Sequence, residues 1–139
     1  MAVKVVGMIH AGVRVAPDAA SVARAEEIYG GLLGFQADGG RPEIPGVPGF
    51  WFNIGASPGA QQVHVMGAEG VSPVARTAQQ DPARPHLAFA VEDLEEAKRE
   101  LERRGIEFWV FGGLVGPASE LVLFEDGCGN MLEFQQAQG

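Results

Sequence analysis

Hydrophobic and polar positions follow a helical period in two segments of this chain. Apolar residues recur every three or four positions over residues 18–33, which predicts a helix with one apolar face. Residues 93–104 show the same period, and Asp93 with Glu96 resembles a capping pair at the start of that helix. A glycine follows each segment, Gly34 and Gly105, at the place of a helix C-cap. The apolar stripes are Val22, Ala25, Ile28, Tyr29 and Leu32 in the first helix, and Leu94, Ala97 and Leu101 in the second.

Most of the remaining chain alternates between apolar and polar positions, which is the period of a β-strand. The alternation predicts strands over residues 3–15, 50–54, 61–66, 85–91, 107–110, 120–124 and 131–135. The order is strand, helix and several strands, and then the same again, which indicates an α+β fold with an internal repeat. We place module one at about residues 3–66, a linker at about 67–84 and module two at about 85–136, within a single domain over residues 1–139.

Four of the predicted strands have an aliphatic face and an opposite face that carries one side chain able to bind a metal. The four side chains are His10, His64, His86 and Glu133, and they include every histidine of the chain. In the strand of His86, Leu87 belongs to the aliphatic face. His10 and His86 occupy corresponding places in the repeat, as do His64 and Glu133. Imidazole nitrogens and a carboxylate suit one divalent ion such as Zn, Ni, Co, Fe or Mn, with a position left for water or substrate.

Composition narrows the class of protein. The chain has 139 residues and a formal net charge of -8, which argues against nonspecific attraction to nucleic acid or to an anionic membrane. Cys128 is the only cysteine, so an intrachain disulfide is excluded and a reducing compartment fits. No apolar run approaches the roughly 20 residues of a membrane span, and the N-terminus lacks the form of a signal peptide. We therefore expect a cytoplasmic protein whose partner is a small molecule.

Four stretches of sequence together point to a known family. They are residues 9–15 (IHAGVRV), 28–35 (IYGGLLGF), 85–91 (PHLAFAV) and 129–134 (GNMLEF). In combination they resemble the vicinal oxygen chelate superfamily, which includes glyoxalase I, methylmalonyl-CoA epimerase, extradiol dioxygenases, and the fosfomycin and bleomycin resistance proteins. The resemblance implies the glyoxalase/bleomycin resistance/dioxygenase-like fold, with two βαβββ modules in a cupped mixed sheet, and a homodimer. It also implies metal ligands from the first and last strand of each module, which are His10, His64, His86 and Glu133.

The resemblance leaves several reactions open. The shared chemistry is chelation of adjacent substrate oxygens by the metal, which stabilises an enediolate-type intermediate. By similarity to glyoxalase I we expect a glyoxalase-like lyase or isomerase, in which Glu133 is both a ligand and the catalytic proton-transfer group. Glyoxalase I usually has a second glutamate at the place of His64, so the alternatives stay open. These are a methylmalonyl-CoA epimerase-like isomerase, a non-catalytic small-molecule or drug-binding protein, and an extradiol-type dioxygenase, which ranks lower because every histidine is already assigned to the metal.

Five other side chains are candidates for substrate contacts or for orienting the ligands. Arg14 shares a face with the first histidine and is the best candidate for binding an anionic group of the substrate. Trp51 and Trp109 lie in aromatic runs, and we expect them to line the substrate pocket. Gln62 and Gln135 share faces with predicted ligands and are candidates for hydrogen bonds to them.

Overall fold

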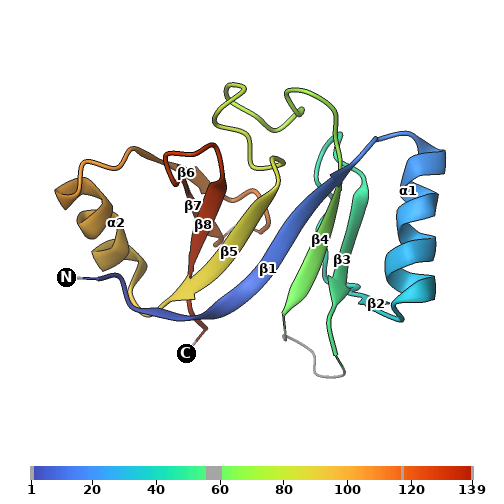
Figure 1. Ribbon diagram of the computed structural model, residues 1–139, viewed down its shortest axis with the longest axis horizontal. Coiled ribbons are helices and arrows are strands. Elements are labelled where there is room, and N and C mark those ends of the chain that lie inside the picture. Colours follow the sequence, from blue (N-terminus) through green and yellow to red (C-terminus); the bar gives the residue numbers. More distant parts are fainter. Residues whose placement is uncertain (1, 56–60, 117, 139) are drawn as a thin grey trace. The chain divides into compact units, whose positions relative to one another are not determined.

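The computed structural model describes residues 2–55, 61–116 and 118–138, and the chain forms two compact units. The first unit is residues 10–85, and the second combines residues 1–9 with residues 86–139. Strand β1, Val5–Val15, passes from the second unit into the first at residue 10. Figure 1 labels the elements of both units.

The first unit contains one helical segment and, after β1, three further strands. Helix α1, Ala19–Ala25, continues directly into the π-helix η1, Glu26–Leu32. Strands β2, Gln36–Ala37, β3, Gly49–Asn53, and β4, Gln62–Gly67, follow. Their order in the sheet is β2-β3-β4-β1 (Figure 1). Strand β1 pairs with β4 in parallel, whereas β4 with β3 and β3 with β2 are antiparallel.

The second unit repeats this arrangement. Strand β5, His86–Val91, leads into helix α2, Leu94–Arg103, and strands β6, Phe108–Gly112, β7, Glu120–Glu125, and β8, Met131–Gln136, follow. The order in the sheet is β5-β8-β7-β6, with β5 and β8 parallel and the other neighbours antiparallel. In each unit the first strand therefore lies beside the last. The predicted α+β fold with two βαβββ modules and mixed strand pairing is confirmed.

The helical segment of the first unit begins at Asp18, whose side chain accepts a hydrogen bond of 2.8 Å from the Ser21 amide. A helix over residues 18–33 is confirmed, but its second half is π-helical, and the Leu33 amide donates to the Ile28 carbonyl. The wider turn of a π-helix rotates later residues relative to the face that an α-helix would bury. Leu32 is 74% exposed, so its predicted place on a buried apolar stripe is wrong.

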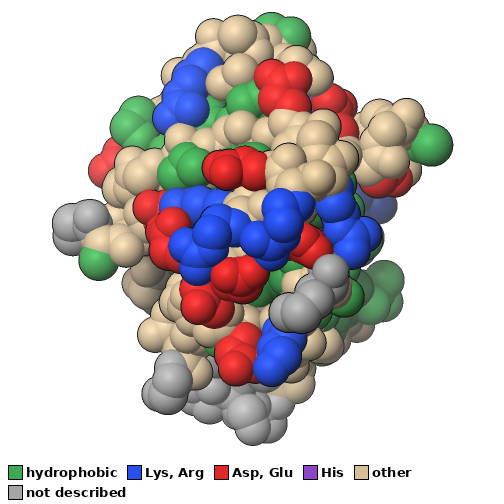
Figure 2. Space-filling view, turned by 90° about the vertical axis from the view of Figure 1, so that its left-hand side faces the viewer, with side chains coloured by type: hydrophobic (Ala, Val, Ile, Leu, Met, Phe, Trp, Pro, Cys, Tyr) green, Lys and Arg blue, Asp and Glu red, His purple; other side chains and the backbone are tan. Residues whose placement is uncertain are grey.

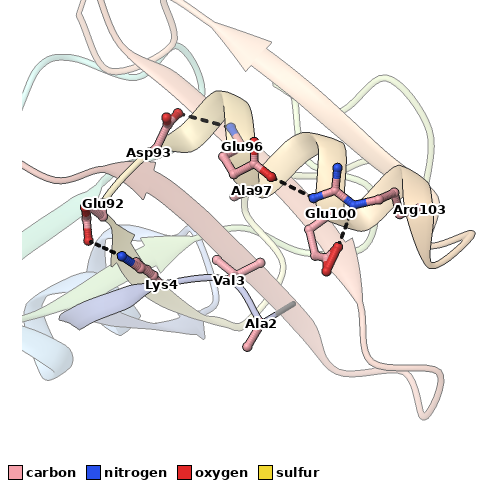
Figure 3. A pocket seen from close by; sticks show the side chains of 9 residues that line it. All are labelled: Ala2, Val3, Lys4, Glu92, Asp93, Glu96, Ala97, Glu100 and Arg103. Carbon is pink, nitrogen blue, oxygen red and sulfur yellow. Dashed lines mark hydrogen bonds and ion pairs between the residues drawn. The ribbon is translucent and has the colours of Figure 1, made fainter.

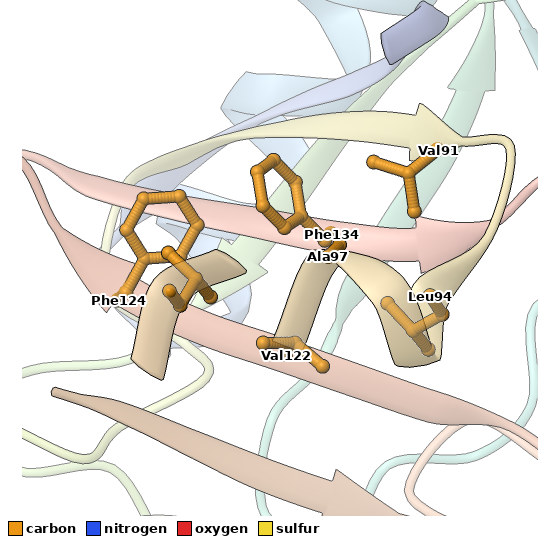
Figure 4. Packing of buried hydrophobic residues seen from close by; sticks show 7 residues of the cluster. Val91, Leu94, Ala97, Val122, Phe124 and Phe134 are labelled. Carbon is orange, nitrogen blue, oxygen red and sulfur yellow. The ribbon is translucent and has the colours of Figure 1, made fainter. Parts of the chain in front are cut away.

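Helix α2 packs its apolar stripe against the strands of the second unit, as predicted. The helix begins at Asp93, whose side chain accepts a hydrogen bond of 3.1 Å from the Glu96 amide. Burial of the stripe fixes which face of strands β5, β7 and β8 the helix covers, and the opposite face of β8 is then the one that carries Glu133. The cluster of buried residues is Val91, Leu94, Ala97, Leu101, Val122, Phe124 and Phe134 (Figure 4).

The outer face of α2 is densely charged. Arg103 donates to Glu96 at 2.7 Å, Arg99 donates to the same carboxylate at 3.0 Å, and Lys98 donates to Glu95 at 3.0 Å. Figure 2 shows acidic and basic side chains interleaved across the face of the molecule that carries this helix. Exposed ion pairs of this kind each contribute little to stability, so the charges indicate a solvated helix face.

Two details of the strands differ from the prediction, and the other strand bounds agree within two residues. Strand β2 was not predicted, because two residues are too few to show an alternation. Leu87 is 43% exposed, so its predicted burial on the aliphatic face of β5 is wrong. The core of the second unit covers the other end of that strand, at Phe89 and Val91. Among the described residues, no helix is long and apolar enough to cross a membrane.

Candidate functional site

Strand pairing brings two predicted ligands together in the first unit. His10 on β1 pairs with Gln62 on β4, and His64 follows two residues later on the same face of β4. The imidazole rings of His10 and His64 stack, with centroids 3.6 Å apart and 17° between their planes. Trp51, which pairs with His64 on the other neighbouring strand, stacks on the His64 ring at 4.5 Å and 5°. Both histidines are buried.

Gln62 connects His64 to a carboxylate. Its Oε1 lies 2.8 Å from Nε2 of His64, and its Nε2 donates to Oδ2 of Asp38 at 2.9 Å and to Oδ1 of Asn53 at 2.8 Å. Asp38 also accepts a hydrogen bond of 2.9 Å from the Gly40 amide. The predicted contact between Gln62 and a ligand is therefore present. Asp38 and Asn53 were missed, since the first follows a two-residue strand and the second ends a strand without any motif.

The second unit holds an equivalent pair. His86 pairs with Met131, and Glu133 follows two residues later, the same register as in the first unit. Nε2 of His86 lies 3.4 Å from Oε1 of Glu133, and both side chains are buried. Gln135 donates to Oε2 of Glu133 at 2.6 Å. Burial raises the pKa of Glu133, and the opposing effects of His86 and the Gln135 hydrogen bond are smaller.

Trp109 lies on the same face of the second sheet as Glu133. It pairs with Leu123, which in turn pairs with Glu133 across β6, β7 and β8. It is buried in an apolar cluster on that face. Both tryptophans thus lie on faces that carry predicted ligands, and their contact with substrate stays a prediction. The cluster is Trp109, Phe111, Leu121, Leu123 and Met131.

Arg14 is engaged by the linker of the first unit. Its Nε donates to the Ala83 carbonyl at 2.6 Å, and its Nη2 donates to Oδ2 of Asp81 at 3.1 Å. Asp81 is 1% exposed and also accepts hydrogen bonds from the Ser72 and Ala83 amides. Arg14 therefore ties β1 to the linker. The guanidinium already donates hydrogen bonds to two protein groups, Ala83 and Asp81. A role of Arg14 in substrate binding stays a prediction.

A hollow of about 250 Å³ lies within the second unit, between residues 2–4 and helix α2. Figure 3 shows its charged side chains paired with one another. Lys4 lies 3.8 Å from Glu92, and Arg103 lies 2.7 Å from Glu96. The described residues that line it include none of the predicted site residues.

The family follows from a match to known sequences. The model of the Glyoxalase/Bleomycin resistance protein/Dioxygenase superfamily matches residues 13–134, and the chain belongs to this family. The matched range includes His64, His86 and Glu133 and begins just after His10. The resemblance inferred from the four sequence stretches is confirmed.

Solved structures with the same fold include an epimerase and a dioxygenase. Methylmalonyl-CoA epimerase from Mycobacterium tuberculosis is 24% identical, with a TM-score of 0.71 over 100% of this chain and 93% of that chain. A hypothetical protein from Bacillus halodurans C-125 is 20% identical, with a TM-score of 0.68 over 95% and 94%. The 2,3-dioxygenase LapB from Pseudomonas sp. KL28 is 18% identical, with a TM-score of 0.70 over 99% and 42%. These similarities to solved structures concern the fold alone. A comparison with curated proteins found no match.

Proposed function

We propose that this protein is a divalent-metal-dependent enzyme of the glyoxalase-like group. It would act as a lyase or isomerase that moves a proton beside adjacent oxygens of a small substrate. The proposed ligands of the ion (Zn, Ni, Co, Fe or Mn) are His10, His86 and Glu133, each buried and each offering one suitable donor atom. His64 is the proposed fourth ligand, and its ring stacks on that of His10.

The observation that carries the proposal is the buried pair of His86 and Glu133. Glu133 is 2% exposed, and ionising a carboxylate in such surroundings costs free energy. A bound cation would offset that cost, and imidazole with carboxylate is a donor set that suits borderline divalent metals. The repeat supplies a third buried donor, because His10 has the register in the first unit that His86 has in the second.

The side chains around the proposed ligands have distinct tasks. When bound, the ion supplies Lewis-acid polarisation of substrate oxygens. Gln135 binds Oε2 of Glu133 and so orients the carboxylate, with Oε1 toward His86. Glu133 is the proposed proton-transfer group. Trp51 and Trp109, on the ligand-bearing faces, are the proposed apolar walls that keep water from the substrate.

Metal analysis and a substrate screen test the proposal together. We expect the purified full chain to carry one divalent ion and, when loaded, to convert a 2-oxoaldehyde thiol adduct or an acyl-CoA epimer. Glu133→Ala should lose both the ion and the activity, whereas Glu69→Ala, an exposed glutamate in the linker, should keep both. A chain that binds none of the five metals would contradict the proposal and favour a non-catalytic binding protein.

An extradiol-type dioxygenase is the second candidate, and one observation favours it. Such an enzyme uses two histidines and one carboxylate on Fe(II) and needs a separate acid or base. The group formed by His10, His86 and Glu133 offers two histidines and one carboxylate of this kind. Oxygen uptake with catechols by the Fe-loaded protein, without turnover of the other substrates, would select this candidate.

A further inference from the structure

The loop between β2 and β3 is anchored to the face of the first sheet that carries His64. At the start of the loop, the carboxylate of Asp38 accepts a hydrogen bond of 2.9 Å from Nε2 of Gln62. Near its end, Val47 is 2% exposed and packs in one buried cluster with Met66. Gln62, His64 and Met66 alternate along β4 and so share one face, which we call the His64 face. Both ends of the loop therefore contact the His64 face.

Arg41 is held within this loop by backbone carbonyls. Its Nη2 donates to the Val47 carbonyl at 2.8 Å, and its Nη1 donates to the Pro42 carbonyl at 3.5 Å. Because Val47 packs against Met66, these contacts place the guanidinium at the end of the His64 face. The side chain is partly buried, and its Nε is shielded from solvent without a hydrogen-bond partner among the described residues. The loop thus fixes the guanidinium but uses only part of its five N–H donors.

The positive charge of Arg41 lacks an acidic partner. Both of its acceptors are neutral carbonyls, and no carboxylate of the described residues forms an ion pair with it. Burial lowers the pKa of Arg41, because the charged form is less well solvated in the loop. Arg14, the arginine predicted to bind an anion, instead has Oδ2 of Asp81 at 3.1 Å from its Nη2. Of these two guanidinium groups, that of Arg41 is the one to which an anion from outside the protein would bring a new counter-ion.

We propose that Arg41 binds an anionic group of the substrate, a carboxylate or a phosphate, at the end of the His64 face. A guanidinium binds such oxygens through charge-assisted hydrogen bonds and can donate two of them at once. The two carbonyls already hold the side chain, so little of its freedom is lost when the anion binds. The formal net charge of -8 gives no general attraction for anions, so the anion needs a specific cation. Use of the site by a substrate rests on the proposed function, whereas binding of an anion does not.

The place of Arg41 sets a condition on the substrate. His64, the proposed fourth ligand, lies two residues before Met66 along β4, which corresponds to about 6–7 Å. A molecule that contacts both His64 and Arg41 therefore needs several bonds between its reacting oxygens and its anionic group. Phosphate or acetate alone is too short to do both. We expect the substrate to be a small molecule with adjacent oxygens at one end and a carboxylate or phosphate at the other.

Arginine side-chain NMR of the ¹⁵N-labelled full chain, titrated separately with phosphate and with acetate at constant ionic strength, tests the anion site directly. We expect the Nε–H signal of Arg41, assigned by its loss in Arg41→Gln, to shift with saturation in at least one titration. Saturation with phosphate alone assigns the site to a phosphate group, with acetate alone to a carboxylate, and with both to either group. A signal that saturates with neither anion would overturn the proposal.

Two variants and a control separate anion binding from a merely structural role of Arg41. Backbone amide signals of the loop report the binding in each protein. Arg41→Lys keeps the charge but loses the planar fork, so we expect it to fold and to bind the anion about tenfold more weakly. Arg41→Gln should show no saturable binding, whereas Arg24→Gln, which changes an exposed arginine paired with Glu27, should bind as the wild type does. Wild-type affinity in both variants of Arg41 would overturn the proposal.

A comparison of two substrates separates this proposal from the proposed function. The adducts of a 2-oxoaldehyde with mercaptoacetate and with mercaptoethanol differ in that only the first carries a carboxylate. For the metal-loaded protein we expect Arg41→Gln to raise KM about tenfold or more for the charged adduct alone, with kcat little changed. Equal changes for both adducts would overturn the proposal. A protein that turns over neither adduct but still binds the anion at Arg41 would contradict the proposed function and leave the anion site in place.

Discussion

Glu133 is a buried carboxylate, and burial makes its charge cost free energy, which a bound cation would offset. Glu133→Gln removes the charge, and the new amide oxygen can still accept the hydrogen bond from Gln135. We expect this variant, free of metal at neutral pH, to unfold at a higher urea concentration than the metal-free wild type. Added metal should stabilise only the wild type. Lower stability of the metal-free variant, or a stabilising effect of metal on it, would contradict this expectation.

The sequence predicts which residues share a face much better than it predicts how polar groups connect. Alternation places His64 beside Gln62 and Glu133 beside Gln135, and both hydrogen bonds are present. The connection from Gln62 to Asp38 depends on the path of the chain between β2 and β3. No periodic pattern encodes such a path, so the carboxylate behind His64 could be found only in the structure.

At the scale of elements, the ion pair of the partly buried Arg14 with the buried Asp81 fastens the linker to β1. Asp81 also accepts hydrogen bonds from Ser72 and Ala83, and its removal would leave those groups and the guanidinium with one acceptor fewer. We expect Asp81→Ala to lower the free energy of unfolding by about 3–5 kcal/mol, the range for breaking a buried pair. Urea denaturation measures the change, with the exposed Glu69→Ala as control. A loss no larger than that of the control would contradict the role of this pair.

Helix α2 gives a prediction for acid conditions. Hydrogen bonds from Arg103 and Arg99 hold the pKa of Glu96 below its ordinary value of 4.5. The folded state therefore favours the ionised form, and this contribution is present above the ordinary pKa and is lost as the pH falls through the lowered one. We expect Glu96→Gln to lose less stability than the wild type between pH 5 and pH 3, by roughly the small amount typical of exposed pairs. Thermal unfolding across that range tests it, and parallel curves would contradict it.

The helices and strands were largely predictable, because the apolar pattern of most of them extends over enough residues to be recognised. Each helix also begins or ends at a recognisable residue. Asp93 caps α2 as predicted, and Gly105 takes a positive φ of 67° just after it. The π-helical turn was not predictable, since it replaces one hydrogen-bonding pattern by another without altering the residue types. Leu32, at the end of this π-helical segment, is exposed although the helical period placed it on the apolar stripe.

For the whole molecule, the internal repeat is the main result that the sequence predicted. Both units place the first strand beside the last, in the same register, although little of their sequence agrees. A single domain over residues 1–139, a homodimer and a cytoplasmic location stay predictions, because they depend on contacts between units or chains that strand and helix patterns do not encode.

We propose, as the central claim, that one metal ion binds to His10, His86 and Glu133. Calorimetric titration of Zn, Ni, Co, Fe or Mn into the metal-free full chain tests it most directly, with His10→Ala from the first unit and His86→Ala from the second. We expect one site per wild-type chain and a loss of affinity of more than about 100-fold in either variant, with the fold retained. Full affinity in either variant would contradict it, because the substituted histidine would then not be a ligand of the ion.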